Sequence, residues 1–210
     1  MSIYILTDKK VEGALNLPTL QIDFLKQNID FNSYDALVFT SKNALFALNS
    51  LYDNSWKTIP SYAIAPKTAQ IIRSFGGNLV FTGVTNHGDK FAQELIPLLQ
   101  NKKVLYLRGS KVVSSLVETL NQNNIICEEV IVYRSNCKSY IKKPILPKGS
   151  TFIFSSPSTI ECFLKNFQWD SSFKAVSIGK TTAKYFPSYI DFTIADTTSL
   201  EACIKKAQEL

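Results

Sequence analysis

Five short polar turns hold most of the side chains in this sequence that could bind a ligand. Each follows a run of apolar residues, precedes a helical pattern and is rich in hydroxyl or basic groups: Thr40-Ser41, Lys67-Thr68, Arg108-Gly109, Ser155-Ser156 and Lys180-Thr181-Thr182. A hydroxyl in such a turn is an ordinary helix N-cap, worth about 1 kcal/mol to the helix. Five such turns indicate more, because helix N-termini offer free N–H groups and a positive dipole end to anions. Together they favour a ligand that carries several carboxylates.

Signatures of several other chemistries are absent from the sequence. It contains neither the GxxxxGK[ST] P-loop nor the GxGxxG dinucleotide fingerprint. Ser155-Ser156 lacks the GxSxG context of a nucleophilic serine, and His87, the single histidine, has no plausible triad position. We interpret His87 as a surface residue near a helix N-terminus. We also expect no metal and no cofactor, so catalysis would depend mainly on positioning a reactive substrate.

The cysteines indicate neither a metal site nor a disulfide framework. Cys127, Cys137, Cys162 and Cys203 are scattered along the chain without a CxxC pair. A zinc site needs clustered ligands, which these residues and one histidine do not supply. We therefore expect reduced thiols in a cytoplasmic protein. The apolar run at residues 3–6 is too short for a signal sequence, and no apolar stretch approaches the length of a membrane span.

The formal net charge of +6 favours anionic partners. Lysine and arginine are nevertheless spread along the whole chain, and the densest cluster, residues 138–143, holds only three lysines. A nucleic-acid binder needs a basic stripe, which this distribution does not provide. The expected partner is therefore a small anionic molecule, with no nucleic acid and no membrane.

Alternating strand and helix patterns must position the polar turns. Expected strands lie at residues 3–6, 36–39, 62–65, 78–81, 104–107, 125–132, 151–154, 175–178 and 192–194. Helical spacing of apolar residues follows most of these strands. The helix after the fourth strand is expected to place Phe91, Leu95 and Leu98 on one face, and a last helix starts near Ser199. Such repetition is typical of a parallel sheet covered by helices on both faces.

The domain organisation follows from a break in this pattern. Residues 134–149 are polar, contain Lys-Lys-Pro and Leu-Pro-Lys-Gly, and show no helical period. The segment after them has too few strands for a good sheet, and the strand at 3–6 has no partner nearby. We therefore predict that one domain is built from residues 1–17 plus 149–210 and a second from 34–131. Residues 18–33 and 132–148 would be linker segments.

An internal echo supports two related halves. Residues 37–44 resemble residues 152–159, with Phe154 lying 115 residues after Phe39. Residues 63–69 resemble residues 177–183 at an offset of 114 residues. Two matches at nearly one offset suggest that the strand–turn–helix units of the halves are related.

Five segments occur in an order that resembles the uroporphyrinogen-III synthase family. They are residues 35–44, 107–109, 132–134, 154–158 and 177–183, and the resemblance covers about residues 30–205. It implies an α/β fold of two flavodoxin-like parallel-sheet domains, joined by a two-stranded linker, with a discontinuous first domain. The N-terminus departs from the family pattern. Only about ten residues precede Leu17-Pro18 after the first strand, so its helix is expected to be missing or reduced to a turn.

The resemblance also implies a reaction and a set of site residues. The family dehydrates and cyclises hydroxymethylbilane to uroporphyrinogen III with inversion of ring D, without a cofactor. Its conserved tyrosine corresponds to Tyr133, which would act on the departing hydroxyl as the catalytic group. Substrate-binding roles would fall to the threonines Thr68, Thr181 and Thr182 and to Ser41, Ser155, Ser156, Ser158, Arg108, Gly109 and Lys180. Family habit suggests a monomer that receives its substrate from hydroxymethylbilane synthase.

Two other functions remain open on the residues alone. A non-catalytic two-domain binding protein for an anionic small molecule would have the same architecture, because fold does not imply function. Such a binder should tolerate Tyr133→Phe with little loss beyond one hydrogen bond. An FMN-binding protein of the flavodoxin type is disfavoured, because no hydroxyl-rich phosphate loop follows the first strand.

Overall fold

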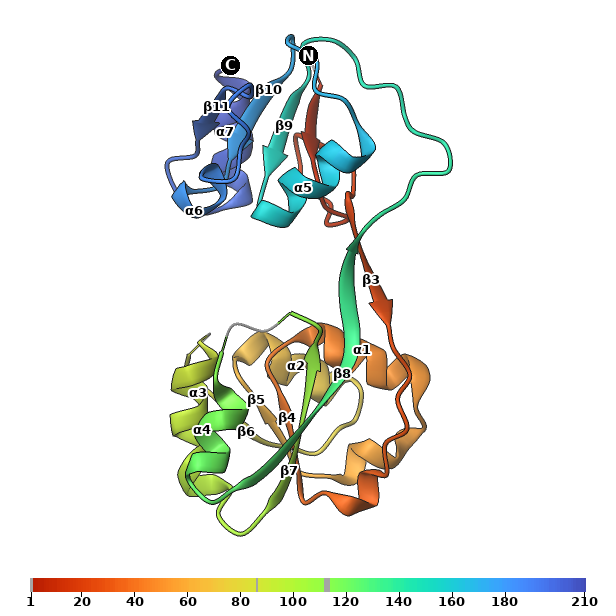
Figure 1. The fold of residues 1–210 in the computed structure, drawn as a ribbon, viewed down its shortest axis with the longest axis vertical. Helices are drawn as coiled ribbons and strands as arrows, with labels where there is room; N and C mark the ends of the chain where they lie inside the picture. Colours follow the sequence, from red (N-terminus) through yellow and green to blue (C-terminus); the bar gives the residue numbers. More distant parts are fainter. Residues whose placement is uncertain (1, 86, 112–113) are drawn as a thin grey trace. The chain divides into compact units, whose positions relative to one another are not determined.

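The chain forms two compact units, each with its own sheet and helices (Figure 1). The structure is a computed structural model that describes residues 2–85, 87–111 and 114–210. Unit 1 contains Met1–Gln21 and Asn136–Leu210, and unit 2 contains Ile22–Ser135. Unit 1 therefore combines the two ends of the chain.

Unit 2 is built on a sheet with the strand order β3-β8-β7-β4-β5-β6. The strands of this sheet are β3 (Leu20–Phe24), β4 (Ala36–Phe39), β5 (Ser61–Ala63), β6 (Leu79–Thr82), β7 (Lys103–Gly109) and β8 (Ile126–Cys137), of which β3 begins and β8 ends two residues outside the bounds of unit 2. All pairings from β8 to β6 are parallel. The helices are α1 (Lys42–Leu51), α2 (Pro66–Ser74), α3 (Gly88–Leu95) and α4 (Leu116–Gln122), with short 3-10 helices at Phe31–Ser33, Asn54–Thr58 and Ile96–Leu98.

The buried strand β4 shows why the unit has three layers. All four of its residues are buried, as expected of a central parallel strand with both faces covered. Leu37 and Phe39 pack with residues of α1 and α2. Ala36 and Val38 point to the opposite face, where they pack with residues of α3 and α4. The sheet is thus enclosed between two helix pairs.

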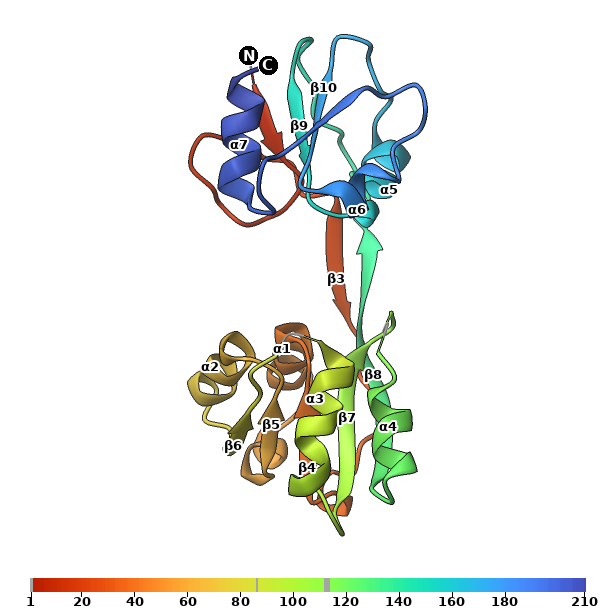
Figure 2. The same ribbon diagram turned by 90° about the vertical axis from the view of Figure 1, so that its left-hand side faces the viewer.

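Unit 1 has a five-stranded parallel sheet in the order β11-β10-β9-β1-β2. Its elements are β1 (Ile3–Ile5), β2 (Leu15–Asn16), β9 (Thr151–Phe154), α5 (Pro157–Asn166), β10 (Lys174–Ser177), α6 (Lys180–Ala183), β11 (Phe192–Ile194) and α7 (Leu200–Gln208). Figure 2 shows α5 and α6 on one side of this sheet and α7 on the other. Accordingly, Phe152 and Phe154 pack with α5, whereas Ile153 packs with α7.

The predicted α/β class with two parallel sheets is confirmed, and a strand is present at each expected position. The region between β1 and β2 contains turns and bends but no helix, as its short length predicted. The expectation for Leu98 was wrong, because α3 ends at Leu95 and Leu98 is 38% exposed. Pro97 lacks an N–H group, and the chain continues there as a 3-10 turn instead of an α-helix.

The expectation that all cysteines are reduced thiols was wrong for one pair. Cys137 and Cys162 form a disulfide in unit 1, with their Cα atoms 5.0 Å apart. Folding brings the segment after β8 against α5, where Asn166 Nδ2 donates a 2.8 Å hydrogen bond to the Lys138 carbonyl. The spacing of the cysteines in the sequence does not predict this contact. The other two cysteines, Cys127 and Cys203, are buried free thiols.

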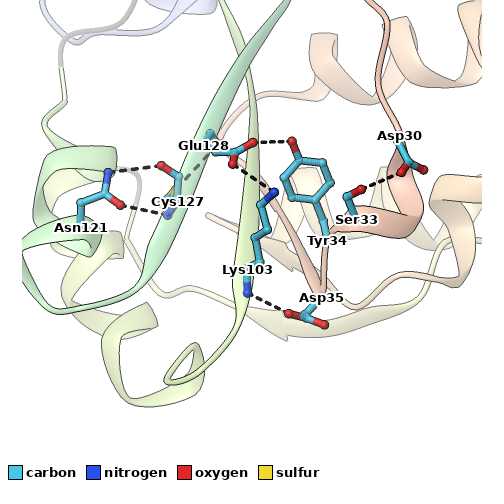
Figure 3. Close-up of polar contacts among 8 residues, drawn as sticks. All are labelled: Asp30, Ser33, Tyr34, Asp35, Lys103, Asn121, Cys127 and Glu128. Carbon is cyan, nitrogen blue, oxygen red and sulfur yellow. Dashed lines mark hydrogen bonds and ion pairs between the residues drawn. The ribbon is translucent and has the colours of Figure 1, made fainter.

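A polar cluster ties the amino ends of β4, β7 and β8 together (Figure 3). Glu128 accepts a 2.6 Å hydrogen bond from the Tyr34 hydroxyl and lies 3.1 Å from the Lys103 ammonium. Asp35 accepts from the Lys103 backbone N–H at 2.8 Å. Burial and the Glu128 carboxylate raise the pKa of Tyr34 to about 12, while Tyr34 and Lys103 lower the pKa of Glu128. The charged groups at this end are thus engaged with one another.

Candidate functional site

A cavity of about 370 Å³ opens in unit 2 at the carboxyl ends of the parallel strands β4, β5 and β7. Ligands of open parallel sheets bind at this edge. The wall combines these strand ends with the start of α3, the loop after β7 and one residue of β8. Its residues are Thr40, Ser41, Ile64, His87, Gly88, Asp89, Tyr106, Gly109, Lys111, Ser114 and Tyr133.

The turn after β4 contributes two hydroxyl groups to the cavity wall. Ser41 is the N-cap of α1, and its hydroxyl accepts a 3.2 Å hydrogen bond from the Asn43 N–H. The Thr40 hydroxyl lies 2.7 Å from the hydroxyl of Tyr106 on the neighbouring strand β7. Tyr106 is only 2% exposed, and its burial raises the pKa of its hydroxyl. The predicted Ser41 therefore lies in the cavity, next to a hydroxyl pair.

Tyr133 lies in the cavity wall, next to an irregularity in the pairing of β7 and β8. Arg108 pairs with Ile131, but Gly109 pairs with Tyr133, so the register shifts by one residue between them. The Tyr133 ring lies against Gly109, where an added Cβ would come within 2.6 Å of the ring carbon Cζ. A further 2.9 Å hydrogen bond joins the Ser110 N–H to the Tyr133 carbonyl. The bulge and the glycine together hold the phenol ring against the cavity.

Arg108 and Thr68 are in unit 2 but do not line this cavity. The Arg108 guanidinium binds both Glu129 oxygens, through Nε at 2.8 Å and Nη2 at 2.6 Å, and a third N–H donates to the Gly109 carbonyl. The Glu129 carboxylate raises the pKa of Arg108 accordingly. Thr68 lies in the first turn of α2, is 6% exposed and donates its N–H to the Ala65 carbonyl.

The remaining predicted residues lie at the carboxyl ends of β9 and β10 in unit 1. Ser155, Ser156 and Ser158 surround the start of α5, where the Thr159 hydroxyl accepts from the Ser156 N–H at 3.2 Å. Lys180 and Thr181 are exposed at the start of α6, whereas Thr182 is buried at 4% exposure. The structure thus divides the predicted set into two groups, one at the corresponding edge of each sheet.

Several cavity residues were missed from the sequence. His87 is exposed at the N-cap of α3, as predicted, but it also lines the cavity. Asp89 accepts from both the N–H and the hydroxyl of Ser115, at 2.8 and 3.0 Å, which links the starts of α3 and α4. A signal was present, because Thr85 to Asp89 is another polar turn between a strand and a helix. Tyr106 gave no such signal, since it reads as part of an apolar strand.

Two features are absent from the part of the chain that the structure describes. No group of three or more His, Cys, Asp or Glu residues is placed to hold a metal ion there. None of its helices is long and apolar enough to cross a membrane.

Comparisons with known proteins agree on one family. The family model described as uroporphyrinogen-III synthase HemD matches residues 9–205. The crystal structure of uroporphyrinogen-III synthetase from Helicobacter pylori is 30% identical over 99% of this chain and 98% of that chain, with a TM-score of 0.78. A mutant uroporphyrinogen III synthase from Thermus thermophilus is 12% identical over 99% and 97% of the chains, with a TM-score of 0.50, which shows likeness of fold alone. No curated protein matches the chain.

Proposed function

The chain belongs to the uroporphyrinogen-III synthase family, and from this we propose how its own residues carry the reaction. The enzyme acts in tetrapyrrole biosynthesis, where it dehydrates and cyclises hydroxymethylbilane to uroporphyrinogen III with inversion of ring D. The C–O bond of the terminal hydroxymethyl group must break, and the oxygen leaves as water. We assign the proton donor for this departure to Tyr133, with no metal or cofactor in the step.

One observation carries this assignment: the Tyr133 ring is held in the wall of a polar cavity at the carboxyl edge of a parallel sheet. A tyrosine hydroxyl can both donate and accept a hydrogen bond, so it can give a proton to a leaving hydroxyl and recover one afterwards. Gly109 and the adjacent bulge fix the ring, which reduces the entropy lost when the reacting groups are brought together.

Substrate binding is assigned to the hydroxyl and N–H groups of the predicted turns. Helix N-termini attract carboxylates through their free N–H groups, and both units present such turns after buried strands. In unit 2 this role falls to Ser41 and Gly109 in the cavity wall, to Thr68 in the first turn of α2, and to Arg108, whose guanidinium would exchange Glu129 for a substrate carboxylate. In unit 1 it falls to Ser155, Ser156, Ser158, Lys180, Thr181 and Thr182.

An isomer assay tests the role of Tyr133. Hydroxymethylbilane is generated in place and incubated with the purified chain, and the oxidised products are separated by chromatography. The bilane alone closes to the type I isomer, so the type III fraction measures the enzyme. We expect Tyr133→Phe to reduce kcat by about a hundredfold, within the usual range for a general acid. Tyr185→Phe, at a tyrosine of unit 1 that is 61% exposed, serves as the matched control.

Each outcome of this assay separates two functions. Loss of type III product in Tyr133→Phe alone supports the catalytic assignment. Full activity of Tyr133→Phe would move the proton donor to another group. If the folded wild-type chain released only type I product while still binding the bilane, a non-catalytic binding protein for an anionic small molecule would replace the synthase.

We further propose a cytoplasmic monomer that receives its unstable substrate from hydroxymethylbilane synthase. The transfer from one enzyme to the other is supported by the spontaneous closure of the free bilane, which would compete with a slow transfer through solution. Co-sedimentation of the two enzymes during turnover tests contact, and the sedimentation coefficient of the chain alone tests its oligomeric state. Because a reducing compartment opens most disulfides and Cys162 is buried, alkylation of denatured cell extracts should find both Cys137 and Cys162 modified in a cytoplasmic chain.

A further inference from the structure

We infer that Tyr106 and Thr40 form a two-hydroxyl relay, in which Tyr106 polarises Thr40 and Thr40 donates a hydrogen bond to a substrate carboxylate. The inference rests on the proposed function and adds to the known reaction a binding residue, Thr40, and a positioning residue, Tyr106. It concerns unit 2 alone.

The two residues come together through the register of neighbouring parallel strands. Val38 of β4 pairs with Tyr106 of β7, and Thr40 follows Val38 by two residues, directly after the end of β4. The phenol reaches along the strand direction to the edge, where the two oxygens lie 2.7 Å apart. Both residues line the cavity, and Thr40 is the more exposed of the two.

The hydroxyl pair of Tyr106 and Thr40 has one hydrogen that it can donate to a ligand. Two hydroxyl groups carry two hydrogens, and the bond between them uses one, so one O–H remains available to a ligand. A phenol is the more acidic partner and therefore the better donor. Burial raises the pKa of Tyr106 further above its ordinary value, which keeps it protonated at neutral pH. The favoured arrangement has Tyr106 donating to Thr40, and the Thr40 hydrogen is left for the cavity.

A hydroxyl that accepts one hydrogen bond donates a stronger one, because bonds in a chain polarise each other. Bonds to a charged acceptor are roughly twice as strong as neutral ones. A carboxylate in this cavity thus gains more from Thr40 than from a free threonine. The same wall contains Tyr133, so a carboxylate held by Thr40 would fix the neighbouring pyrrole ring near the proposed proton donor.

The test is a double-mutant cycle on kcat/KM for type III product, with Tyr106→Phe, Thr40→Val and the double variant. We expect Tyr106→Phe to lose about tenfold, since one charge-assisted hydrogen bond is weakened, and Thr40→Val to lose at least as much. The double variant should be no worse than Thr40→Val, because Tyr106 acts only through Thr40. Thr40→Ser keeps the hydroxyl and should stay within about threefold of wild type.

One further measurement separates the relay from a structural role. The Tyr106 hydroxyl proton should give a slowly exchanging NMR signal in the wild type and in Thr40→Ser, and lose it in Thr40→Val. Tyr133→Phe, measured in parallel, tests the proposed proton donor independently. If this variant keeps full activity, the double-mutant cycle on Tyr106 and Thr40 still tests the relay. Fully additive losses in the cycle, or a Tyr106→Phe variant with unchanged kcat/KM, would overturn the relay.

Discussion

Units 1 and 2 place corresponding strands in the same spatial order, although the chain enters the two sheets at different strands. Unit 1 reads β2-β1-β9-β10-β11 and unit 2 reads β8-β7-β4-β5-β6, with β3 added at its edge. The sequence echo joins β4 to β9 and β5 to β10, which occupy equivalent places in the two orders. One arrangement of strands thus accommodates two connectivities, and unit 2 is a permuted version of unit 1.

The units differ in how completely their sheets are covered. The β7–β8 connection of unit 2 contains α4, whereas the equivalent β1–β2 connection of unit 1 contains only turns and bends. Helix α6 is also only four residues long, against nine for its equivalent α2. Unit 1 fills the α5 face with rings in mutual contact: Phe152, Phe154, Phe163, Phe167, Trp169, Phe173 and Phe186. Aromatic packing on the α5 face thus compensates for the short helix α6.

The largest expected effect comes from a substitution that disrupts this aromatic packing. Phe163 is fully buried, with its ring centroid 4.8 Å from that of Phe152. Phe163→Ala should lower the free energy of unfolding of unit 1 by about 3–5 kcal/mol. Leu48→Ala, at a fully buried residue of α1, is the counterpart in unit 2, with an expected cost of about 2–5 kcal/mol. Hydrogen exchange by mass spectrometry resolves the units, and equal loss of protection in both after either change would contradict their independence.

The disulfide also distinguishes the two units, because both of its cysteines belong to unit 1. Closing a loop between residues 25 positions apart restricts the unfolded chain and stabilises the fold by about 3 kcal/mol. Reduction, or Cys137→Ser with Cys162→Ser, should therefore lower the thermal stability of unit 1 and leave unit 2 unchanged. Scanning calorimetry with and without a reducing agent measures this, and no shift in either transition would show that the loop is already restrained.

Two glycines at strand ends test whether the site depends on close packing. A Cβ on Gly109 would meet the Tyr133 ring at 2.6 Å, whereas one on Gly179 meets nothing nearer than 3.7 Å. Gly109→Ala should cost about 1–3 kcal/mol in stability through overpacking. It should also lower type III synthesis by up to about 10²-fold by moving the Tyr133 ring, since a misplacement of about 1 Å can cause a loss of that size. Gly179→Ala should leave both nearly unchanged, and comparable losses in the two variants would contradict a special role for Gly109.

The smallest expected effect concerns the polar cluster at the amino ends of the unit 2 strands. Tyr34 and Lys103 lower the folded-state pKa of Glu128, so its contribution to stability is present above its unfolded value, about 4.3. That contribution is lost as the pH falls through the lower folded value. Urea unfolding between pH 3 and 7 should show the wild type more stable than Glu128→Gln at neutral pH, with the difference vanishing at the acid end. A difference independent of pH would assign the effect to packing.

Continuous apolar runs and helical spacing made most of the fold predictable. β4 and β9 are buried at every residue, so their apolar runs stand out from the polar turns that follow. β2 was not expected, because it has two residues and Leu15 is 54% exposed. Its strand conformation depends on pairing with β1, which no local pattern records.

From the residues alone the candidate site was predictable only in its turns, whereas Tyr133 was predicted from the family resemblance. Thr40 and Ser41 carry the signal of polar groups directly after a buried strand. Tyr106, in contrast, becomes a cavity residue through the register of β4 and β7, and the contact of Gly109 with Tyr133 depends on a bulge in the pairing of β7 with β8. Register and bulges arise from pairing between distant segments, so a single sequence does not reveal them.

The pairing of β1 with β9 determines the order in which the two units can fold during translation. Ile3 pairs with Thr151, so the first strand emerges long before its partner has been made. At translation rates of about 5–20 residues per second, that interval lasts on the order of ten seconds. Unit 2 is complete by Ser135 and can fold during this wait, while β1 remains without its partner strand β9. The permuted order of the chain therefore makes the second unit the first to mature.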